Sequence, residues 1–271
     1  MHRSIVDAIG LDALLGMSAW IVLACGRVPL GNAGFAAIGG AATLLLEVRY
    51  RVPVSIAIVA AIACSALIGF ALGAVLARAE RVPFAVATLA FGIVAGGIAV
   101  PGRVTAEAAS SATIQILAVL ALTFFLMWRF MRSRDGRAFA AVAQDERAAA
   151  TSGMAPPHLR LIAVAASAAI AGSAGALIAA AHGAYDDAWF GLAQNAGALA
   201  CAVVGGAGAI AGPAIGALAL AGIPLLAPPL ASHAALVDVA LLLCFATLLP
   251  GGLASLAAPL FRRRPEGAGP P

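Results

Sequence analysis

The polar interruption at residues 129–160 contains the run Gly136-Arg137-Ala138-Phe139-Ala140-Ala141-Val142-Ala143-Gln144-Asp145-Glu146-Arg147-Ala148-Ala149-Ala150, followed by Gly153 and Pro156-Pro157. The alanine-rich part predicts one helix over residues 138–150, because Gly153 suits a C-terminal cap and the prolines prevent continuation. Phe139, Val142 and Ala143 give this helix a narrow apolar face. It is either a rigid knob that docks into a cytoplasmic partner or a solvated connector.

The composition indicates a membrane protein. Of the 271 residues, 63% are hydrophobic and only 10% are charged, whereas soluble domains carry about 25% charged residues. The net charge is +4, and no lysine occurs. The lack of lysine excludes a P-loop, whose lysine reaches the phosphates of a nucleotide, so ATP hydrolysis would belong to another subunit. No basic stripe with interleaved aromatic residues indicates nucleic-acid binding.

Nine apolar segments are candidate membrane spans, because a helix needs about 20 apolar residues to cross a bilayer. They predict an all-α fold, a polytopic transmembrane helical bundle of eight or nine membrane segments with one or two short or broken helices. Segments 30–46 and 192–204 are the weaker candidates, because the first opens with glycines and the second is too short for a straight span. Either could be re-entrant or broken, which is tolerated only where protein or a water-filled cavity surrounds the helix. The nine segments are residues 8–25, 30–46, 54–76, 84–100, 112–130, 161–181, 192–204, 210–226 and 234–249.

The arginines predict the orientation. With the 132–160 loop in the cytoplasm, twelve of the 16 arginines lie on the inner side, in agreement with the positive-inside rule. We therefore expect residues 1–261 to form one transmembrane domain of the plasma (inner) membrane, with the 132–160 loop and the C-terminus in the cytoplasm. Residues 262–271 are expected to be a disordered cytoplasmic tail.

A glycine-rich block follows the segment at 192–204, and its small residues suit close packing of membrane helices. It imitates a dinucleotide-binding fingerprint, but no acidic residue follows about 20 residues later to hold a ribose. The sequence also has no catalytic motif and no metal-ligand spacing, so we expect no catalytic site, metal or cofactor. The expected helix-packing residues are Gly205, Gly206, Gly208, Gly212, Pro213 and Gly216.

Two carboxylates lie inside apolar segments, Asp12 in the first and Asp238 in the last. Ionisable groups in membranes are costly and often functional, so a proton-coupled secondary transporter of a small polar solute is the alternative function. A packing or interfacial role of both residues is the favoured interpretation. The runs at 31–34 and 194–197 share Asn-Ala-Gly, a match that a chain rich in alanine and glycine can produce by chance.

Five stretches match the patterns of one known family: Val28-Pro29-Leu30-Gly31-Asn32-Ala33-Gly34-Phe35-Ala36-Ala37-Ile38-Gly39, Phe84-Ala85-Val86-Ala87-Thr88-Leu89-Ala90-Phe91-Gly92, residues 136–149, residues 204–216 and Leu249-Pro250-Gly251-Gly252-Leu253. They resemble the membrane permease of branched-chain amino acid ABC importers, the Liv type, and specifically the longer of its two permease subunits. Asn32 stands where that family usually has histidine, and the region at 101–111 is shorter than usual.

The resemblance implies a non-enzymatic transport subunit that takes up branched-chain or other small amino acids. The partners it implies are ABC ATPase subunits, a second permease subunit, a periplasmic substrate-binding protein and membrane lipid, with no nucleic acid. It also favours the docking interpretation of the loop helix. The expected ATPase-coupling residues are Gly136, Arg137, Phe139, Asp145, Glu146 and Arg147, and the expected translocation path contains Asn32, Gly34 and Asn195.

Overall fold

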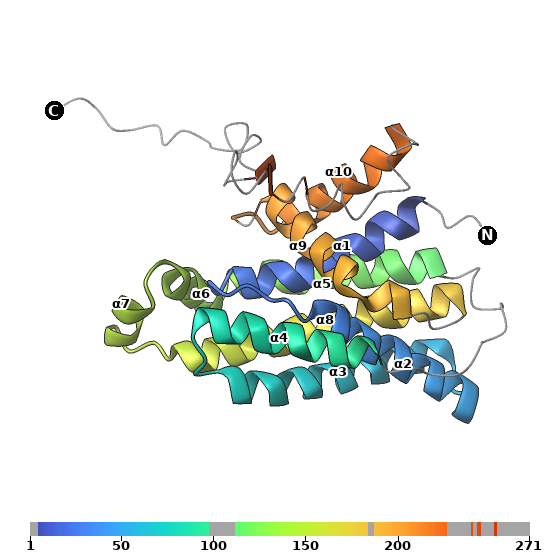
Figure 1. Ribbon diagram of the computed structural model, residues 1–271, viewed down its shortest axis with the longest axis horizontal. Coiled ribbons are helices and arrows are strands. Elements are labelled where there is room, and N and C mark those ends of the chain that lie inside the picture. Colours follow the sequence, from blue (N-terminus) through green and yellow to red (C-terminus); the bar gives the residue numbers. More distant parts are fainter. Residues whose placement is uncertain are drawn as a thin grey trace.

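The computed structural model describes residues 5–97, 112–183, 187–206 and 208–226, together with positions 240, 243, 244, 252 and 253. Across these residues the chain is helical and contains no strand, which confirms the all-α class. Most of the helices run along one long axis, as in a transmembrane bundle (Figure 1). In chain order the elements are α1 (Ile5–Leu23), α2 (Asn32–Tyr50), α3 (Val54–Leu76), α4 (Arg81–Gly96), α5 (Ala112–Met131), α6 (Arg134–Gln144), α7 (Glu146–Thr151), α8 (Pro156–His182), the 3-10 helix η2 (Asp187–Phe190), α9 (Leu192–Gly205) and α10 (Gly212–Leu226).

Four helices in the described part of the chain are long and apolar enough to cross a membrane: Ile5–Leu23, Val54–Leu76, Thr113–Met131 and Pro156–His182. Two of them, α3 and α5, expose large apolar side chains along their length, among them Val59, Leu67 and Phe125. A monomeric soluble protein rarely leaves such extensive apolar surface in water, whereas lipid covers it without cost. The chain is therefore a multi-pass helical membrane protein.

α8 forms the centre of the bundle and packs against α1, α2 and α3. Glycines allow α2 and α8 to cross at close range. A Cβ atom on Gly39 would collide with the backbone of Gly172, and one on Gly175 with the backbone of Ala36. Such contacts hold helices together in lipid, where apolar surface is not driven out of the solvent and van der Waals packing has to supply the attraction.

α2 begins inside the bundle rather than at its edge. After α1 ends at Leu23, residues 24–31 run back along the bundle before α2 starts at Asn32 (Figure 1). The hydroxyl of Ser167 donates a hydrogen bond to the Asn32 side chain. Ser167 lies eleven residues after the first residue of α8, a rise of about 16 Å. The start of α2 thus lies beside the middle of α8 and not at the end of the bundle, and from there α2 runs as one continuous helix of 19 residues. A re-entrant path for segment 30–46 stays a prediction.

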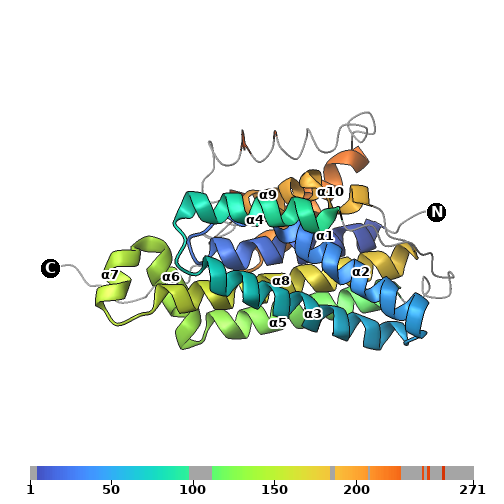
Figure 2. The ribbon, with the colours of Figure 1, turned by 60° about the horizontal axis from the view of Figure 1, so that its bottom comes forward.

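α9 is the second short element. Its 14 residues span about 21 Å, less than the hydrocarbon thickness of about 30 Å. It follows η2 and turns back into α10, and both helices pack against α1. Figure 2 shows this pair lying along one side of the bundle, and Asn195 near the start of α9 lies close to Gly92 of α4. α9 is therefore too short to cross a bilayer as one straight helix.

Two of the expected elements differ from the structure, and two others lie mostly or entirely outside the described residues. The single helix predicted over residues 138–150 is wrong, because α6 and α7 are separated at Asp145, whose backbone is extended (φ −147°, ψ 106°). The segment predicted to begin at residue 84 starts at Arg81. The segment at 234–249 lies outside the described residues except at positions 240, 243 and 244, and the tail at 262–271 lies outside them entirely.

Candidate functional site

α6 is anchored to the end of α5 through its first turn and its apolar face. Ser133 caps the helix, since its hydroxyl oxygen accepts a hydrogen bond from the amide of Gly136 at 3.3 Å. A Cβ atom on Gly136 would lie 2.5 Å from the carbonyl oxygen of Phe130, so the approach requires glycine. Phe139 is fully buried and meets Phe130 edge-on, with 5.1 Å between ring centroids. The α6–α7 hairpin (residues 134–151) is therefore packed against the bundle.

Asp145 divides the hairpin into two helices. Its carboxylate accepts hydrogen bonds from the amides of Arg147 (2.9 Å) and Ala148 (3.1 Å). Aspartate is a strong N-cap residue, because it satisfies amides that have no partner within the helix. This capping explains why the predicted continuous helix is wrong: the high helix propensity of the alanines does not outweigh it. The side chain expected to contact an ATPase is engaged within the hairpin, and its wider role stays a prediction.

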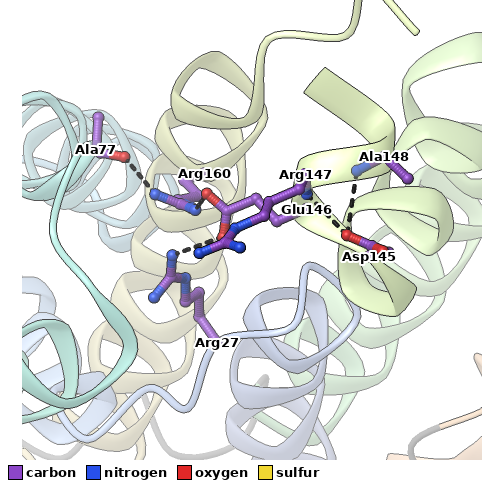
Figure 3. A network of polar contacts seen from close by, with 7 residues as sticks. All are labelled: Arg27, Ala77, Asp145, Glu146, Arg147, Ala148 and Arg160. Atoms are coloured by element: carbon purple, nitrogen blue, oxygen red, sulfur yellow. Dashed lines mark hydrogen bonds and ion pairs between the residues drawn. The ribbon is translucent and has the colours of Figure 1, made fainter. Parts of the chain in front are cut away.

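Glu146 joins the hairpin to two buried arginines (Figure 3). Its Oε2 pairs with Nη2 of Arg27 at 3.1 Å, and its Oε1 pairs with Nη2 of Arg160. The side chains of Arg27 and Arg160 are only 5% and 4% exposed, and that of Glu146 is 41% exposed. Nη1 of Arg160 also donates to the carbonyl oxygen of Ala77 at 2.8 Å. The Glu146 carboxylate thus connects α7 with α8 and with the residues after α1, and Arg160 extends the contact to the end of α3.

The charge balance of this cluster is positive. Burial lowers the pKa of Arg27 below its usual value, and the neighbouring charge of Arg160 lowers it further, while Glu146 acts in the opposite direction. One carboxylate faces two guanidinium groups. Within the described residues, Nη1 of Arg27 and Nε of Arg160 are buried donors without a hydrogen-bond partner.

Arg137 and Arg147, the other two charged residues expected at the ATPase, are exposed on the hairpin. Arg137 donates through Nη1 to the backbone carbonyl of Arg132 at 3.0 Å, which leaves the rest of its guanidinium group at the surface. These positions are compatible with a partner contact from below the membrane. Their role in coupling remains a prediction.

A second polar cluster lies inside the bundle, where α2 begins. The amide of Ala33 donates to Oδ1 of Asn195 at 2.8 Å, so a side chain from α9 caps the first turn of α2. Oδ1 of Asn32 accepts from the hydroxyl of Ser167 at 3.2 Å, and the amide of Leu30 donates to Oγ1 of Thr88 at 3.3 Å. The interior junction (Asn32, Thr88, Ser167 and Asn195) is buried, with exposed fractions of 4% or less.

The interior junction brings together the two weak segments that share Asn-Ala-Gly. Asn32 and Asn195 come from the start of α2 and the first turn of α9. Gly34 lies beside α4, where an added Cβ atom would be 2.8 Å from Cα of Gly92. Nδ2 of Asn32 is buried without a hydrogen-bond partner among the described residues. The three residues expected on the translocation path thus lie at one place in the fold, and their contact with substrate remains a prediction.

Residues 24–31 connect the two clusters. At their outer end, the Cβ atom of an alanine at Gly26 would lie 3.0 Å from Cα of Ala143 in α6, and Arg27 pairs with Glu146. At their inner end, a Cβ atom on Gly31 would lie 2.5 Å from the carbonyl oxygen of Thr88. An eight-residue segment is therefore held by the hairpin at one end and by α4 and α9 at the other.

The glycine block lies where α9 turns into α10. Added Cβ atoms on Gly205 and Gly216 would collide with the backbones of Gly212 and Cys201, respectively. Gly206 has a positive φ of 115°, which favours glycine. Gly212 is packed against the backbone of Gly206, and Pro213 lies against Gly16 of α1. Gly208 differs, because an added Cβ atom there would meet no atom of the described residues within 4 Å.

Two carboxylates formed the basis of the alternative function. Asp12 is half-buried on α1 and makes at least one polar or electrostatic interaction. Asp238 lies outside the described residues. Nothing in their described surroundings distinguishes a proton-coupling role from a packing role.

Sequence reasoning missed four residues of the two clusters. Arg27 and Arg160 were counted only as inner-side charges, and Thr88 and Ser167 were treated as parts of apolar segments. The available signal was the polar residue type within or beside a span, because such groups need a partner in lipid. That signal does not identify the partner, which comes from residues up to 135 positions away in the chain.

Comparison with known proteins identifies the family. Residues 4–250 match the model of the family described as branched-chain amino acid transport system / permease component. The chain is 30% identical, over 246 residues, to the high-affinity branched-chain amino acid transport system permease protein LivM of Salmonella typhimurium, covering 75% of this chain and 56% of that protein. It is 39% identical over 92 residues to LivM of Escherichia coli, covering 34% of this chain and 22% of that protein.

The chain spans about half the length of the first of these curated relatives (56%). No solved structure matches this protein. The family match covers more than half of the chain and includes both polar clusters and the hairpin between α5 and α8. This chain belongs to the permease-component family of branched-chain amino acid transport systems.

Proposed function

We propose that this chain is the membrane-spanning permease subunit of an ATP-driven ABC importer for branched-chain or other small amino acids. Separate ATPase subunits hydrolyse the ATP, a second permease subunit pairs with this one, and a periplasmic binding protein delivers the substrate. The chain lies in the plasma (inner) membrane with its C-terminus in the cytoplasm. The observation that carries this proposal is the α6–α7 hairpin, which stands at one end of the bundle (Figure 1) in a chain of this permease family.

The hairpin suits docking because it is both charged outside and anchored inside. Arg137 and Arg147 are exposed, whereas Phe139 and Val142 are buried. A helix held by a buried aromatic ring moves with the element it is packed on instead of bending away from it. An ATPase that grips the exposed face therefore moves the ends of α5 and α8 as well.

Residues 24–31 extend this movement into the membrane. Glu146 holds Arg27 at the hairpin, and the amide of Ala33 binds Asn195 in the interior. When closure of the ATPases displaces the hairpin, the start of α2 shifts relative to α9. Such a rigid-body shift between two arrangements is the physical form of alternating access.

The interior junction is the proposed place of substrate passage. A hollow of about 310 Å³ lies beside Asn195 and is lined by small residues of α4, among them Gly92 and Gly96. Separation of α9 from α2 frees the amide of Ala33, which Asn195 now occupies. Amides at a helix start favour anionic groups, and interrupted membrane helices are used in this way in transporters. The carboxylate of a small amino acid fits that chemistry.

The test is co-expression of the chain with candidate ATPase, second-permease and binding-protein partners, followed by reconstitution in liposomes. We expect ATP hydrolysis that the substrate-loaded binding protein stimulates. Arg137→Glu should raise the dissociation constant of the ATPase for the permease by about tenfold, a loss of about 1.4 kcal/mol of binding free energy, and less ATPase should be recovered with the permease. The matched control is Arg49→Glu, an exposed arginine in the last turn of α2, which should retain the ATPase.

The alternative function predicts a different result in the same preparation. If no ATPase subunit is recovered with the wild-type chain, and the chain alone moves solute together with protons, the proposal is wrong. Asp12 and Asp238 then become the first residues to replace.

A further inference from the structure

A hollow of about 810 Å³ opens at the hairpin end of the bundle. Its walls come from the connection between α3 and α4, from the α6–α7 hairpin and from the first turn of α8. Arginines predominate over carboxylates, which leaves an excess of two positive charges. The arginines are Arg27, Arg78, Arg81, Arg147 and Arg160, and the carboxylates are Glu80, Asp145 and Glu146.

Two of these arginines have a hydrogen-bond donor without an acceptor among the described residues. Nη1 of Arg27 and Nε of Arg160 have no hydrogen-bond partner in the described part of the chain, and both side chains are at least nine-tenths buried. Both residues line the hollow. A buried guanidinium donor without an acceptor is costly, and the two donor atoms lie beneath the surface of the hollow. The positive charge of these two side chains favours an anion in the hollow. Of the three carboxylates, Asp145 is already engaged in capping α7.

Two helix starts add positive potential at the same place. α4 begins at Arg81 and α8 at Pro156, and neither is capped by a side chain. Residues of both first turns line the hollow. The N-terminal end of a helix carries about half a positive charge from its aligned peptide dipoles. In α8 this contribution comes from the dipole alone, because Pro156 and Pro157 have no amide hydrogen.

We propose that this hollow binds a phosphate group, carried by an anionic lipid headgroup or free in solution. Guanidinium groups pair with phosphate through short, charge-assisted hydrogen bonds, and membrane proteins bind anionic headgroups in basic pockets at the cytoplasmic face. Val82 lines the hollow and is 73% exposed, which suits an amphiphile whose acyl chain lies along the helices. The site is a separate inference from the importer proposal and requires no ATPase.

The test uses the purified, delipidated full chain in a neutral detergent. Phosphatidylglycerol and phosphatidylcholine with the same acyl chains are titrated separately, and bound lipid is counted by native mass spectrometry. Arg81→Gln removes one exposed arginine of the hollow and leaves the Arg27–Glu146–Arg160 contacts in place. Arg49→Gln makes the same charge change in the last turn of α2, at a residue that does not line the hollow. Both variants are compared with the wild-type chain.

We expect phosphatidylglycerol to bind more tightly than phosphatidylcholine, and Arg81→Gln to weaken it by about tenfold, or about 1.4 kcal/mol, while Arg49→Gln has no effect. Inorganic phosphate, compared with sodium chloride at equal ionic strength, separates the two sources. If inorganic phosphate displaces phosphatidylglycerol, the phosphate group alone suffices for binding. If inorganic phosphate does not displace it, the site holds a lipid headgroup. Equal binding of both lipids without any effect of phosphate, or equal losses in the two variants, would overturn the proposal.

Discussion

The two polar clusters of this molecule both join segments of the bundle through buried polar groups, but they use different chemistry. The Arg27–Glu146–Arg160 cluster at the hairpin end uses full charges, whereas the interior junction uses only amides and hydroxyls. Glu146 keeps 41% of its side chain exposed, so water reaches the charged cluster. An unpaired ion buried inside the bundle costs several kcal/mol, and the neutral groups that hold the start of α2 avoid this cost.

The difference also bears on movement. An ion pair between buried arginines and one carboxylate resists separation, because either partner left alone in a buried site is strongly destabilised. A single amide-to-carbonyl hydrogen bond contributes about 1 kcal/mol net. We therefore expect the hairpin end to move as one body and the contact between α2 and α9 to be the one that opens.

The largest expected effect is the loss of Glu146. Glu146→Ala leaves Arg27 and Arg160 buried and facing each other without a counter-charge, and we expect a loss of about 3 kcal/mol of stability, the low end for a broken buried pair. Thermal unfolding of the purified chain in detergent measures it. The control is Asp135→Asn, an exposed carboxylate in the first turn of α6. If both variants melt alike, the charged cluster does not hold the hairpin.

A smaller effect is expected at the interior junction. Asn195→Ala removes the acceptor of the buried Ala33 amide, and an unsatisfied buried donor costs about 1–2 kcal/mol. The same thermal unfolding experiment applies, with Gln194→Ala as the neighbouring control. If Asn195→Ala lowers the stability as much as Glu146→Ala does, the charged cluster at the hairpin is not held more firmly than the interior junction.

The smallest and most local effect is expected at Asp145. Asp145→Ala removes the cap of α7 and should cost about 1 kcal/mol, whereas Asp145→Asn should retain most of the capping. Hydrogen–deuterium exchange at the amides of Arg147 and Ala148 reports this directly. Faster exchange in both variants would show that the carboxylate charge matters beyond capping. Unchanged exchange in Asp145→Ala would show that Asp145 does not separate the two helices.

Most helices of the fold could be predicted from the lengths of the apolar segments and from the charged, glycine and proline residues that separate them. Segments 54–76 and 112–130 were predicted to within one residue of α3 and α5, because a lipid-facing helix is apolar all around and ends where charges begin. The hairpin was predicted as one helix because its alanines suggest continuity. Asp145 breaks it, and the choice between an internal helix residue and an N-cap is decided by a few tenths to about 1 kcal/mol.

The candidate sites could be predicted only in part. Asn32 and Asn195 were selected as polar residues at the start of weak segments, and the structure places them at one junction. Gly208 was grouped with the packing glycines, but an added Cβ atom there has no close neighbour in the described part of the chain. The partners of Glu146 were not foreseeable, since Arg27 lies 119 positions before it and nothing in the local sequence at either position indicates the other.

The sequence by itself determined that this is an all-helical membrane protein with one charged, partly helical loop between its apolar halves, because hydrophobicity and charge are properties of local segments. Only the tertiary structure decided which polar groups meet. Glycine contacts such as Gly39 with Gly172 set how closely α2 and α8 cross, and that distance sets which side chains can reach each other. The arginine hollow and the Ala33–Asn195 contact depend on such crossings, which no single segment specifies.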